Sequence, residues 1–271
     1  MKSLLVMDLV YFVLALLSAW PLLVHGQSAA STAFTPKVGK CPSGFSLVRQ
    51  AGPSSNQSLS KSELAYLQAR KFDVLPGAWK SYLANVQQYN VSLPDYVPSI
   101  LSGYGASSPN LGIAISGGGY RAAIFGAGIL NALDGRNSTS VSTGIGGLLQ
   151  SATYLSALSG SSWLLTSLVQ ANFPLFQELI FGSNTSSGYA GWLAQFGVVA
   201  PTNSSTQNQE YIAGLIEEIK GKHDAGFPVT IADVWARALA RHFVNGTSVA
   251  NFFNDSSTHG AGITLSELAN L

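Results

Sequence analysis

Charged side chains are scarce in this sequence. Lys, Arg, Asp and Glu make up 10% of its 271 residues, against roughly 25% in a typical soluble protein. The formal net charge is only +1, which argues against nucleic acid as a partner. Hydrophobic residues reach 46%, which is enough for a sizeable core and argues against an intrinsically disordered chain.

Something other than charge must therefore keep the surface solvated, and attached sugar is a candidate. The acceptor pattern N-x-[ST] recurs along the chain, although a sequence this rich in Ser, Thr and Asn produces a few such matches by chance. We expect a glycoprotein if the chain enters the secretory pathway. The acceptor asparagines would be Asn56, Asn90, Asn137, Asn184, Asn203, Asn245 and Asn254.

Cysteine is almost absent as well. Cys41 is the only one, so no disulfide can form within the chain. A single cysteine is unusual in a secreted protein and indicates that its partner is missing.

The amino terminus favours secretion. Lys2 precedes an apolar run over residues 9–24, and small residues follow from Gly26 onward. This pattern predicts a signal peptide over residues 1–26. A membrane anchor is the alternative, but the run is shorter than a span of about 20 residues and contains Pro21. We expect the protein to be secreted or held at the cell surface.

The chain after this leader divides into an arm and a folded part. Residues 27–60 are rich in Ser, Pro and Gly and predict an extended arm with little regular structure. Ser60 and Glu63 form a capping box that opens a first helix, and a second helical pattern covers residues 77–88. We expect both helices to precede the main sheet.

Helical patterns return in the second half of the chain. One helix is expected to end at Gly221, and Thr230 and Asp233 open another that runs to Phe243. A further capping box at residues 264–267 lies four residues before the last residue, and a helix of one or two turns is barely stable by itself. We therefore expect the C-terminal part of the domain to be missing.

The clearest pattern in the sequence is a pair of similar segments. The stretches NLGIAISGGGYRAAIFGAGILNAL (residues 110–133) and LLQSATYLSALSGSSWLLTSLVQANFP (residues 148–174) each combine a run of strand length, a tight turn of small residues and a helical pattern. Two strand–turn–helix units predict an α/β fold with its site where the strands end.

The first turn, SGGGYRA, favours binding of an anion. Three glycines after a strand leave backbone N–H groups exposed at a helix N-terminus, where a phosphate or an oxyanion can bind. Arg121 adds a fixed charge with a planar donor fork that suits phosphate.

Other interpretations of this turn were weighed. Gly117, Gly119 and Ala122 match a dinucleotide-binding fingerprint, but the acidic residue expected about 20 positions later is absent, and Asp134 is the nearby carboxylate. The Gly-Lys-Ser/Thr ending of an ATPase phosphate loop is missing too. A purely structural turn stays open. We favour an oxyanion hole, because a turn with a serine follows about forty residues later.

That second turn centres on Ser159. A nucleophilic serine between a strand and a helix is typically found in G-x-S-x-G, from which Ala157 to Ser161 departs at both ends. A lone S-G-S is more often an ordinary helix cap. Its pairing with SGGGYRA, in that order, favours a nucleophile.

A serine nucleophile needs a base to take its proton. No histidine or aspartate of the sequence has a context that marks it as that base. The histidines are His25, His223, His242 and His259, and the aspartates after the leader are Asp73, Asp95, Asp134, Asp224, Asp233 and Asp255.

Four stretches together resemble one known family. SGGGYRAAIFGAG, LLQSATYLSALSGSSW, CPSGFSLVR and ADVWARAL are similar to segments of the fungal lysophospholipase or phospholipase B family, whose catalytic domain is related to the cytosolic calcium-activated phospholipases. The resemblance runs from Cys41 to the end, so residues 61–271 would be the N-terminal portion of the catalytic domain. It implies an α/β fold of the nucleophile-elbow type, with a mixed central sheet and flanking helices.

The resemblance also implies roles for residues. Ser159 would attack the ester carbonyl of a lysophospholipid or phospholipid at a lipid–water interface and form an acyl-enzyme. Gly118 and Gly119 would donate hydrogen bonds to the oxyanion, and Arg121 would steady the phosphate. Neither a metal nor another cofactor is implied, and no obligate protein partner is indicated.

Two departures from the family pattern matter. The base would be an aspartate in a D-G-G motif that the 271 residues lack, and losing a base removes about four to six powers of ten in rate. We expect this chain alone to be nearly inactive. Ala157 replaces a glycine, and its methyl would cost about 1 to 3 kcal/mol if the backbone there is strained. A truncated homologue that only binds lipid, or a structural secreted glycoprotein, stays open as the alternative.

Overall fold

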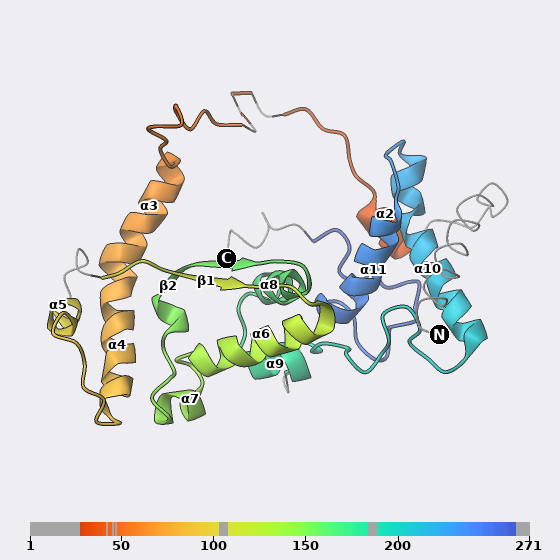
Figure 1. Cartoon of the computed structure of the whole chain (residues 1–271). Coiled ribbons are helices and arrows are strands. Elements are labelled where there is room, and N and C mark those ends of the chain that lie inside the picture. Colours follow the sequence, from red (N-terminus) through yellow and green to blue (C-terminus); the bar gives the residue numbers. More distant parts are fainter. Residues whose placement is uncertain are drawn as a thin grey trace. The chain divides into compact units, whose positions relative to one another are not determined.

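The structure, a computed structural model, describes residues 28–41, 43–44, 46, 48–102, 108–183 and 189–263 (Figure 1). Two compact units make up the chain. Val38–Gly191 is called the sheet unit here, and Met1–Lys37 with Trp192–Leu271 is called the helical unit. The predicted leader, the acceptor Asn184 and the capping box at 264–267 lie outside the described residues.

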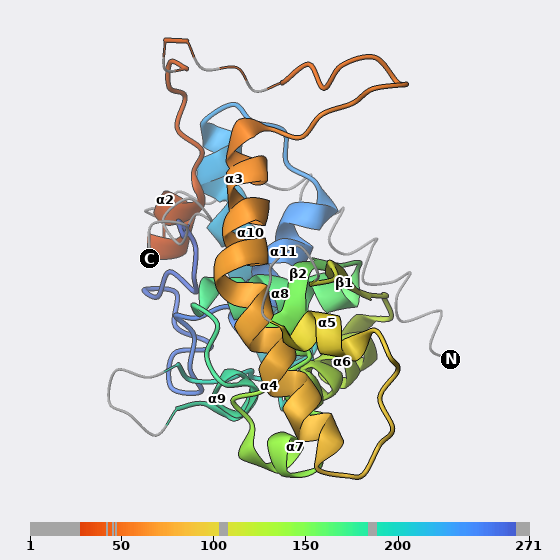
Figure 2. The same ribbon diagram turned by 90° about the vertical axis from the view of Figure 1, so that its left-hand side faces the viewer.

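The sheet unit begins with a helical rod (Figure 2). Ser60 caps it by accepting a hydrogen bond from the Glu63 N–H at 3.1 Å, as predicted. A π-helical turn lies inside the rod just before Pro76, which has no N–H to continue an α-helical ladder. The rod consists of α3 (Lys61–Ala69), η2 (Arg70–Val74) and α4 (Leu75–Gln87), and α5 (Val97–Leu101) follows it.

The two predicted strand–turn–helix units are confirmed. β1 (Leu111–Ile115) leads into α6 (Gly119–Leu133), and β2 (Ala152–Ala157) leads into α8 (Gly160–Gln170). The strands pair in parallel, with Ile115 opposite Ala157, because the long helical connection between them allows the chain to return in the same direction. The remaining elements are α7 (Ser138–Ser142), η4 (Leu149–Ser151) and α9 (Phe176–Phe181).

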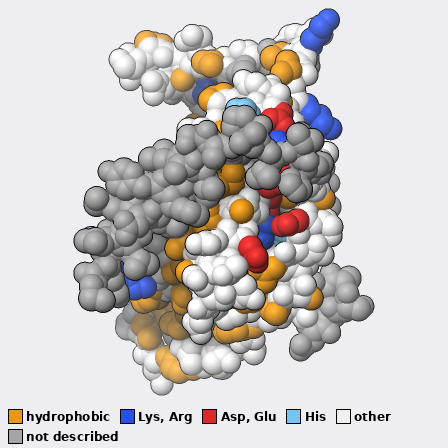
Figure 3. Space-filling model, turned by 90° about the vertical axis from the view of Figure 1, so that its right-hand side faces the viewer, with side chains coloured by type: hydrophobic (Ala, Val, Ile, Leu, Met, Phe, Trp, Pro, Cys, Tyr) orange, Lys and Arg blue, Asp and Glu red, His pale blue; other side chains and the backbone are white. Residues whose placement is uncertain are grey.

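The α/β class is therefore confirmed, but the described sheet is smaller than expected. It contains two strands, both parallel, so the mixed arrangement is not seen within the described residues. None of the described helices combines the length and apolar character that a membrane span needs. On the face drawn in Figure 3, acidic and basic side chains are scattered among uncharged ones, in keeping with the low charge of the sequence.

The helical unit is built on α10 (Ser205–Asp224) and α11 (Ile231–Phe243). The predicted capping box of Thr230 and Asp233 opens α11, with both reciprocal hydrogen bonds present. The apolar core of this unit comprises Leu193, Tyr211, Ile212, Leu215, Ile216, Ile219, Val234, Ala238 and Phe252.

The predicted end of a helix at Gly221 is wrong, since α10 continues to Asp224. Gly221 instead allows α2 (Ala29–Phe34) to lie directly on α10. A Cβ at Gly221 would come within 2.7 Å of the Ser31 carbonyl oxygen, and the Gly221 N–H donates to Ser31 Oγ at 2.8 Å. The glycine is thus a packing residue within the helix.

The same contact corrects the prediction for residues 27–60, where little regular structure was expected. Ser28 caps α2 by accepting a hydrogen bond from the Ser31 N–H at 3.1 Å. Ala30 and Ser31 are fully buried. A short helix forms here because its small side chains allow a close approach to α10.

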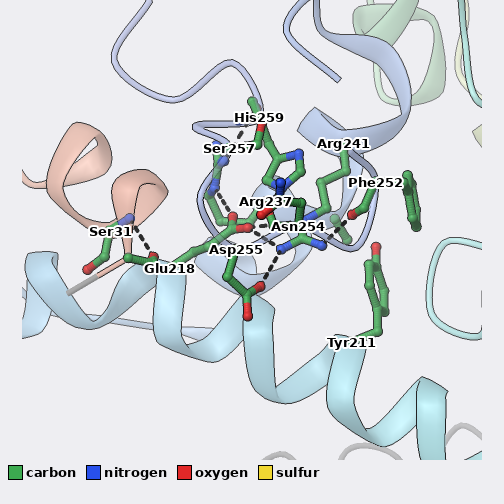
Figure 4. A network of polar contacts seen from close by, with 12 residues as sticks. Ser31, Tyr211, Glu218, Arg237, Arg241, Phe252, Asn254, Asp255, Ser257 and His259 are labelled. Atoms are coloured by element: carbon green, nitrogen blue, oxygen red, sulfur yellow. Dashed lines mark hydrogen bonds and ion pairs between the residues drawn. The ribbon is translucent and has the colours of Figure 1, made fainter. Parts of the chain in front are cut away.

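A buried ion-pair network joins α10 to α11 (Figure 4). Glu218 accepts hydrogen bonds from Arg237 Nε at 2.6 Å and from Arg241 Nε at 3.0 Å. The two guanidinium groups also donate to backbone carbonyls, Arg237 to Thr258 at 2.9 Å and Arg241 to Phe252 at 2.7 Å. Glu218 therefore balances two buried cations that hold the loop after α11, and the exposed Asp255 is a further partner of Arg241, with Oδ1 3.8 Å from Nη2.

His259 completes this network from that loop. Its ring lies near Thr247 Oγ1 at 3.2 Å and the Asn254 carbonyl at 3.0 Å. Burial, helped by the Arg241 charge, lowers the pKa of His259 to about 4. The imidazole is therefore neutral at pH 7 and serves as a structural group.

Replacing Glu218 with Gln should destabilise the protein strongly, because both arginines would lose their buried counter-charge and Arg241 would keep only the exposed Asp255 at 3.8 Å. Breaking such a group typically costs about 3 to 5 kcal/mol. The matched control is Glu217→Gln, since Glu217 only forms a partly exposed ion pair with Lys220 at 3.7 Å, worth about 1 kcal/mol or less. Urea unfolding followed by circular dichroism measures both; equal losses would contradict the assignment.

Candidate functional site

The two glycine-containing turns meet at one edge of the sheet. Parallel strands bring the segments that follow them to the same edge, and two hydrogen bonds join these segments directly. The Leu158 N–H donates to the Ile115 carbonyl at 3.0 Å, and Ser161 Oγ donates to the Ser116 carbonyl at 2.6 Å. The turn after β1 is thus attached to the turn after β2.

Two glycines make this approach possible. A Cβ at Gly117 would lie 2.7 Å from Ser159 Cβ and 3.3 Å from Ser159 Oγ. A Cβ at Gly160 would overlap the backbone of Gly119, lying 2.6 Å from its carbonyl carbon. No larger residue fits either position without moving the opposing turn. The predicted convergence of the two turns is confirmed.

Ser159 has an unusual backbone conformation. Its φ is +54° and its ψ is −125°, a region that costs a residue other than glycine about 1 to 3 kcal/mol. The residue is exposed, and its hydroxyl makes no hydrogen bond within the described residues. The strained residue thus carries an exposed hydroxyl beside Gly117.

Ala157 is not strained, so the conformational cost considered for its methyl group does not arise. It is the last residue of β2 and is absent from the left-handed positions of the described backbone. Its carbonyl accepts a hydrogen bond from Ser162 Oγ at 3.1 Å. An alanine is therefore tolerated before Ser159.

The first turn presents unused hydrogen-bond donors. Gly118 has φ +143° and Gly119 has φ +66°, conformations that favour glycine. Gly118 is the N-cap of α6 without a side-chain cap, and within the described residues neither glycine donates its N–H. Such N–H groups at a helix N-terminus can bind an anion.

Arg121 follows in the first turn of α6. It is exposed and makes no ion pair or hydrogen bond within the part of the chain that the structure describes. A cavity of about 670 Å³, the β1 groove, runs from Gly117, Gly118 and Arg121 along Phe125 and Ile129. Ser159 does not line this groove, so the structure places the arginine beside the glycines and the serine next to them.

Three residues that no sequence pattern indicated hold the turns together. Gly126 lets α6 lie against β1 and α8, since a Cβ there would be 3.1 Å from both Ile115 Cγ2 and Leu164 Cδ2. The rings of Tyr120 and Trp163 meet edge to face at 5.8 Å. Burial raises the pKa of Tyr120, so its phenol stays protonated and supports packing.

Within the described part of the sheet unit, none of the possible bases forms a hydrogen bond or ion pair with Ser159. His223, His242 and His259 belong to the helical unit, and Val38–Gly191 contains no histidine. Burial alone would raise the pKa of Asp134, but hydrogen bonds from Arg136 and Gln150 lower it overall. That aspartate is therefore a structural anion. The described residues also contain no cluster of His, Cys, Asp or Glu that could hold a metal ion.

Comparison with known proteins finds a family and several relatives. The family described as "Lysophospholipase catalytic domain" matches residues 111–266, which include both turns. Lysophospholipase 2 of Aspergillus fumigatus is 36% identical over 245 residues, which cover 89% of this chain and 38% of that protein. Lysophospholipase 2 of Saccharomyces cerevisiae is 34% identical over 256 residues, covering 94% of this chain and 34% of that protein.

The chain thus spans little more than a third of the length of these relatives. Among solved structures, human GIVD cytosolic phospholipase A2 in complex with methyl gamma-linolenyl fluorophosphonate and terbium chloride is 22% identical. That match covers 75% of this chain and 25% of the human chain, with a TM-score of 0.43.

Gly160→Ala should destabilise the sheet unit, because the added methyl would overlap the Gly119 backbone. Overpacking of this kind costs about 1 to 3 kcal/mol, which would lower the Tm by about 2 to 10 °C in a protein of this size. The control is Gly128→Ala on α6, where a Cβ meets nothing within 4 Å and helix propensity favours alanine. Thermal unfolding by intrinsic fluorescence distinguishes them; a Gly160→Ala protein as stable as the control would refute the close contact.

Proposed function

The chain belongs to the lysophospholipase catalytic-domain family, and from this premise we propose that its protein hydrolyses the acyl ester of lysophospholipids. Diacyl phospholipids are further substrates of the same chemistry. The observation that carries the proposal is the contact between the Ser159 turn and the glycine turn, with Gly117 directly against the Ser159 side chain. A hydroxyl and free backbone donors side by side are what acyl transfer requires.

The reaction proceeds through an acyl-enzyme. The Ser159 oxygen attacks the ester carbonyl carbon while its proton passes to a base, and the carbonyl oxygen becomes an oxyanion. The N–H groups of Gly118 and Gly119 bind that oxyanion; one such donor is commonly worth about 2.7 to 4 kcal/mol. Collapse releases the glycerophospho alcohol and leaves the acyl group on Ser159, and water then releases the fatty acid.

Arg121 binds the phosphate of the substrate. Its charge is unused within the described residues, and it lies two positions after Gly119 at the mouth of the β1 groove. Exposed apolar side chains flank the site, with Phe125 73% and Leu158 68% accessible. These side chains suit a lipid–water interface, where such substrates are found.

The base in this proposal is an aspartate outside these 271 residues, forming a Ser–Asp dyad. The support is that no carboxylate in the described part of the sheet unit bonds to Ser159, and that this unit contains no histidine. The chain alone would then be nearly inactive. The same observation favours the second candidate function, a homologue that binds lipid without hydrolysing it. Neither proposal involves a metal or another cofactor.

We also propose that the protein is secreted or held at the cell surface as a glycoprotein, after removal of residues 1–26. Asn137 is the least suitable acceptor described, because it is half-buried and its Nδ2, the atom that would carry the glycan, donates to the Asn131 carbonyl at 3.2 Å. The other described acceptors are exposed: Asn56, Asn90, Asn203, Asn245 and Asn254.

Ser159→Ala should abolish release of fatty acid from lysophosphatidylcholine by the complete protein, and should also abolish labelling by a fluorophosphonate probe. The control Ser156→Ala changes an exposed serine of β2 three positions earlier and should retain both. Labelling that persists in the Ser159→Ala protein would contradict the assignment of Ser159 as the nucleophile. An unlabelled wild-type protein that still binds lysophosphatidylcholine micelles would favour the lipid-binding alternative.

Enzymatic removal of N-linked glycans should lower the mass of the protein recovered from a eukaryotic culture medium. Asn90→Gln should remove one glycan, because Asn90 is exposed in a turn with φ +54°. Asn172→Gln is the matched control, since Asn172 also has positive φ but lies outside an acceptor pattern. Mass spectrometry measures the mass of both variants. A protein absent from the medium, or one of unchanged mass, would argue against this localisation.

A further inference from the structure

A second cavity lies along β2 in the sheet unit, on the strand edge that does not pair with β1. Its volume is about 680 Å³, within the range of small-molecule sites, and we call it the β2 pocket. Its lining includes residues 152–155 of β2 but neither Ser159 nor the glycine turn. The apolar part of the wall consists of Val74, Leu149, Leu155, Leu165, Leu168, Val169, Phe173 and Phe176.

Side chains from the helical rod cover this edge of β2 in place of another strand. Tyr66 donates to the Thr153 carbonyl at 2.5 Å, and Arg70 Nη2 donates to the Gln150 carbonyl at 2.8 Å and to the Ala152 carbonyl. Because only single side chains satisfy these carbonyls, space for a ligand remains between the rod, the strand and α8.

Two arginines line the pocket, and their charges are balanced differently. Arg136 is paired with Asp134, with Nη2 to Oδ2 at 2.7 Å and Nε to both carboxylate oxygens at 3.0 Å. Arg70 forms no ion pair within the described residues and donates only to neutral carbonyls. Its Nε is buried and has no acceptor.

An unbalanced, partly buried cation beside an apolar wall is costly unless an anion binds there. Thr153 also lines the pocket, and its Oγ1 is buried without a partner in the described part of the chain, the residue being only 4% exposed. Arg70 offers a planar donor fork that matches a carboxylate. The polar part of the pocket therefore suits one small anion.

The backbone at Arg70 is also irregular. Arg70–Val74 is a π-helical turn, in which the Leu75 N–H donates to the Arg70 carbonyl, and both Arg70 and Val74 line the pocket. Single π turns inside α-helices are frequent at functional sites. The irregular turn thus coincides with the residues that would contact a ligand.

We propose that the β2 pocket binds a long-chain fatty acid. The carboxylate lies against the Arg70 guanidinium and the Thr153 hydroxyl, and the alkyl chain lies along the apolar wall formed by α8 and α9. A neutral lipid would leave the Arg70 charge unbalanced. This site is separate from the Ser159 turn, and binding there does not depend on the proposed hydrolysis.

The test is equilibrium binding of 12-NBD-stearate, a fluorescent fatty acid, to the protein carrying Ser159→Ala, which excludes an acyl-enzyme. Arg70→Gln should weaken binding at least tenfold, because glutamine removes the charge and the planar donor fork. Val169→Trp should weaken it similarly by filling the pocket. The NBD-labelled alcohol of the same chain length should bind at least tenfold less tightly than the acid.

Controls separate this pocket from other sites. Arg49→Gln removes an exposed arginine and should leave the affinity unchanged, and Arg121→Gln should too if the probe does not bind beside the glycine turn. Unlabelled palmitate should displace the probe, whereas palmitoyl lysophosphatidylcholine at the same concentration should not. Unchanged affinity in both Arg70→Gln and Val169→Trp, displacement by the lysophospholipid, or loss of binding in Arg121→Gln would overturn the proposal.

Discussion

The contact between two turns of backbone, one after β1 and one after β2, is the constraint on which the candidate site depends. Gly117 lies directly against the Ser159 side chain, and Gly160 lies against the backbone of Gly119. Because no side chain separates the turns, the free N–H groups of the first and the hydroxyl of the second share one small region. Ser161 fixes this arrangement by its hydrogen bond to the Ser116 carbonyl.

Other features of the sheet unit follow from that contact. The strained backbone of Ser159 persists because the surrounding turns leave it no alternative position. Gly126 and the Tyr120–Trp163 ring pair keep α6 and α8 close enough for the turns to touch. Preorganised donors matter for acyl transfer because they need no reorganisation when the oxyanion forms. The geometry therefore supports serine esterase chemistry more directly than any single motif does.

Much of this arrangement could be predicted from the sequence, because its signals are local. The strand, turn and helix of each unit follow from apolar runs beside small residues, and the capping box at Thr230 is a four-residue pattern. The end of α10 was predicted wrongly because a glycine near a helix end can either terminate the helix or allow another segment to pack closely. The segment that packs on Gly221 contains Ser31, which lies 190 residues away in the sequence. The helix α2 was not predicted either, because the contact that stabilises it is with α10, far away in the sequence.

The sequence could not show that Arg70 forms no ion pair within the described residues, because this depends on which carboxylates the fold brings near it. Asp134 pairs with Arg136, two residues away, and leaves Arg70 without a counter-ion among the described residues. The buried Arg237 and Arg241 of the helical unit, by contrast, share Glu218. Similar side chains thus have different roles in the two units, which composition alone does not reveal.

The most direct measurement is a crystal structure that resolves the two turns. The account predicts a Ser159 residue with positive φ and an exposed hydroxyl, its Cβ packed against the Gly117 Cα, and Ser161 Oγ within hydrogen-bond distance of the Ser116 carbonyl. A Ser159 in ordinary helical conformation, or one whose side chain is buried away from residues 117–119, would contradict the central claim.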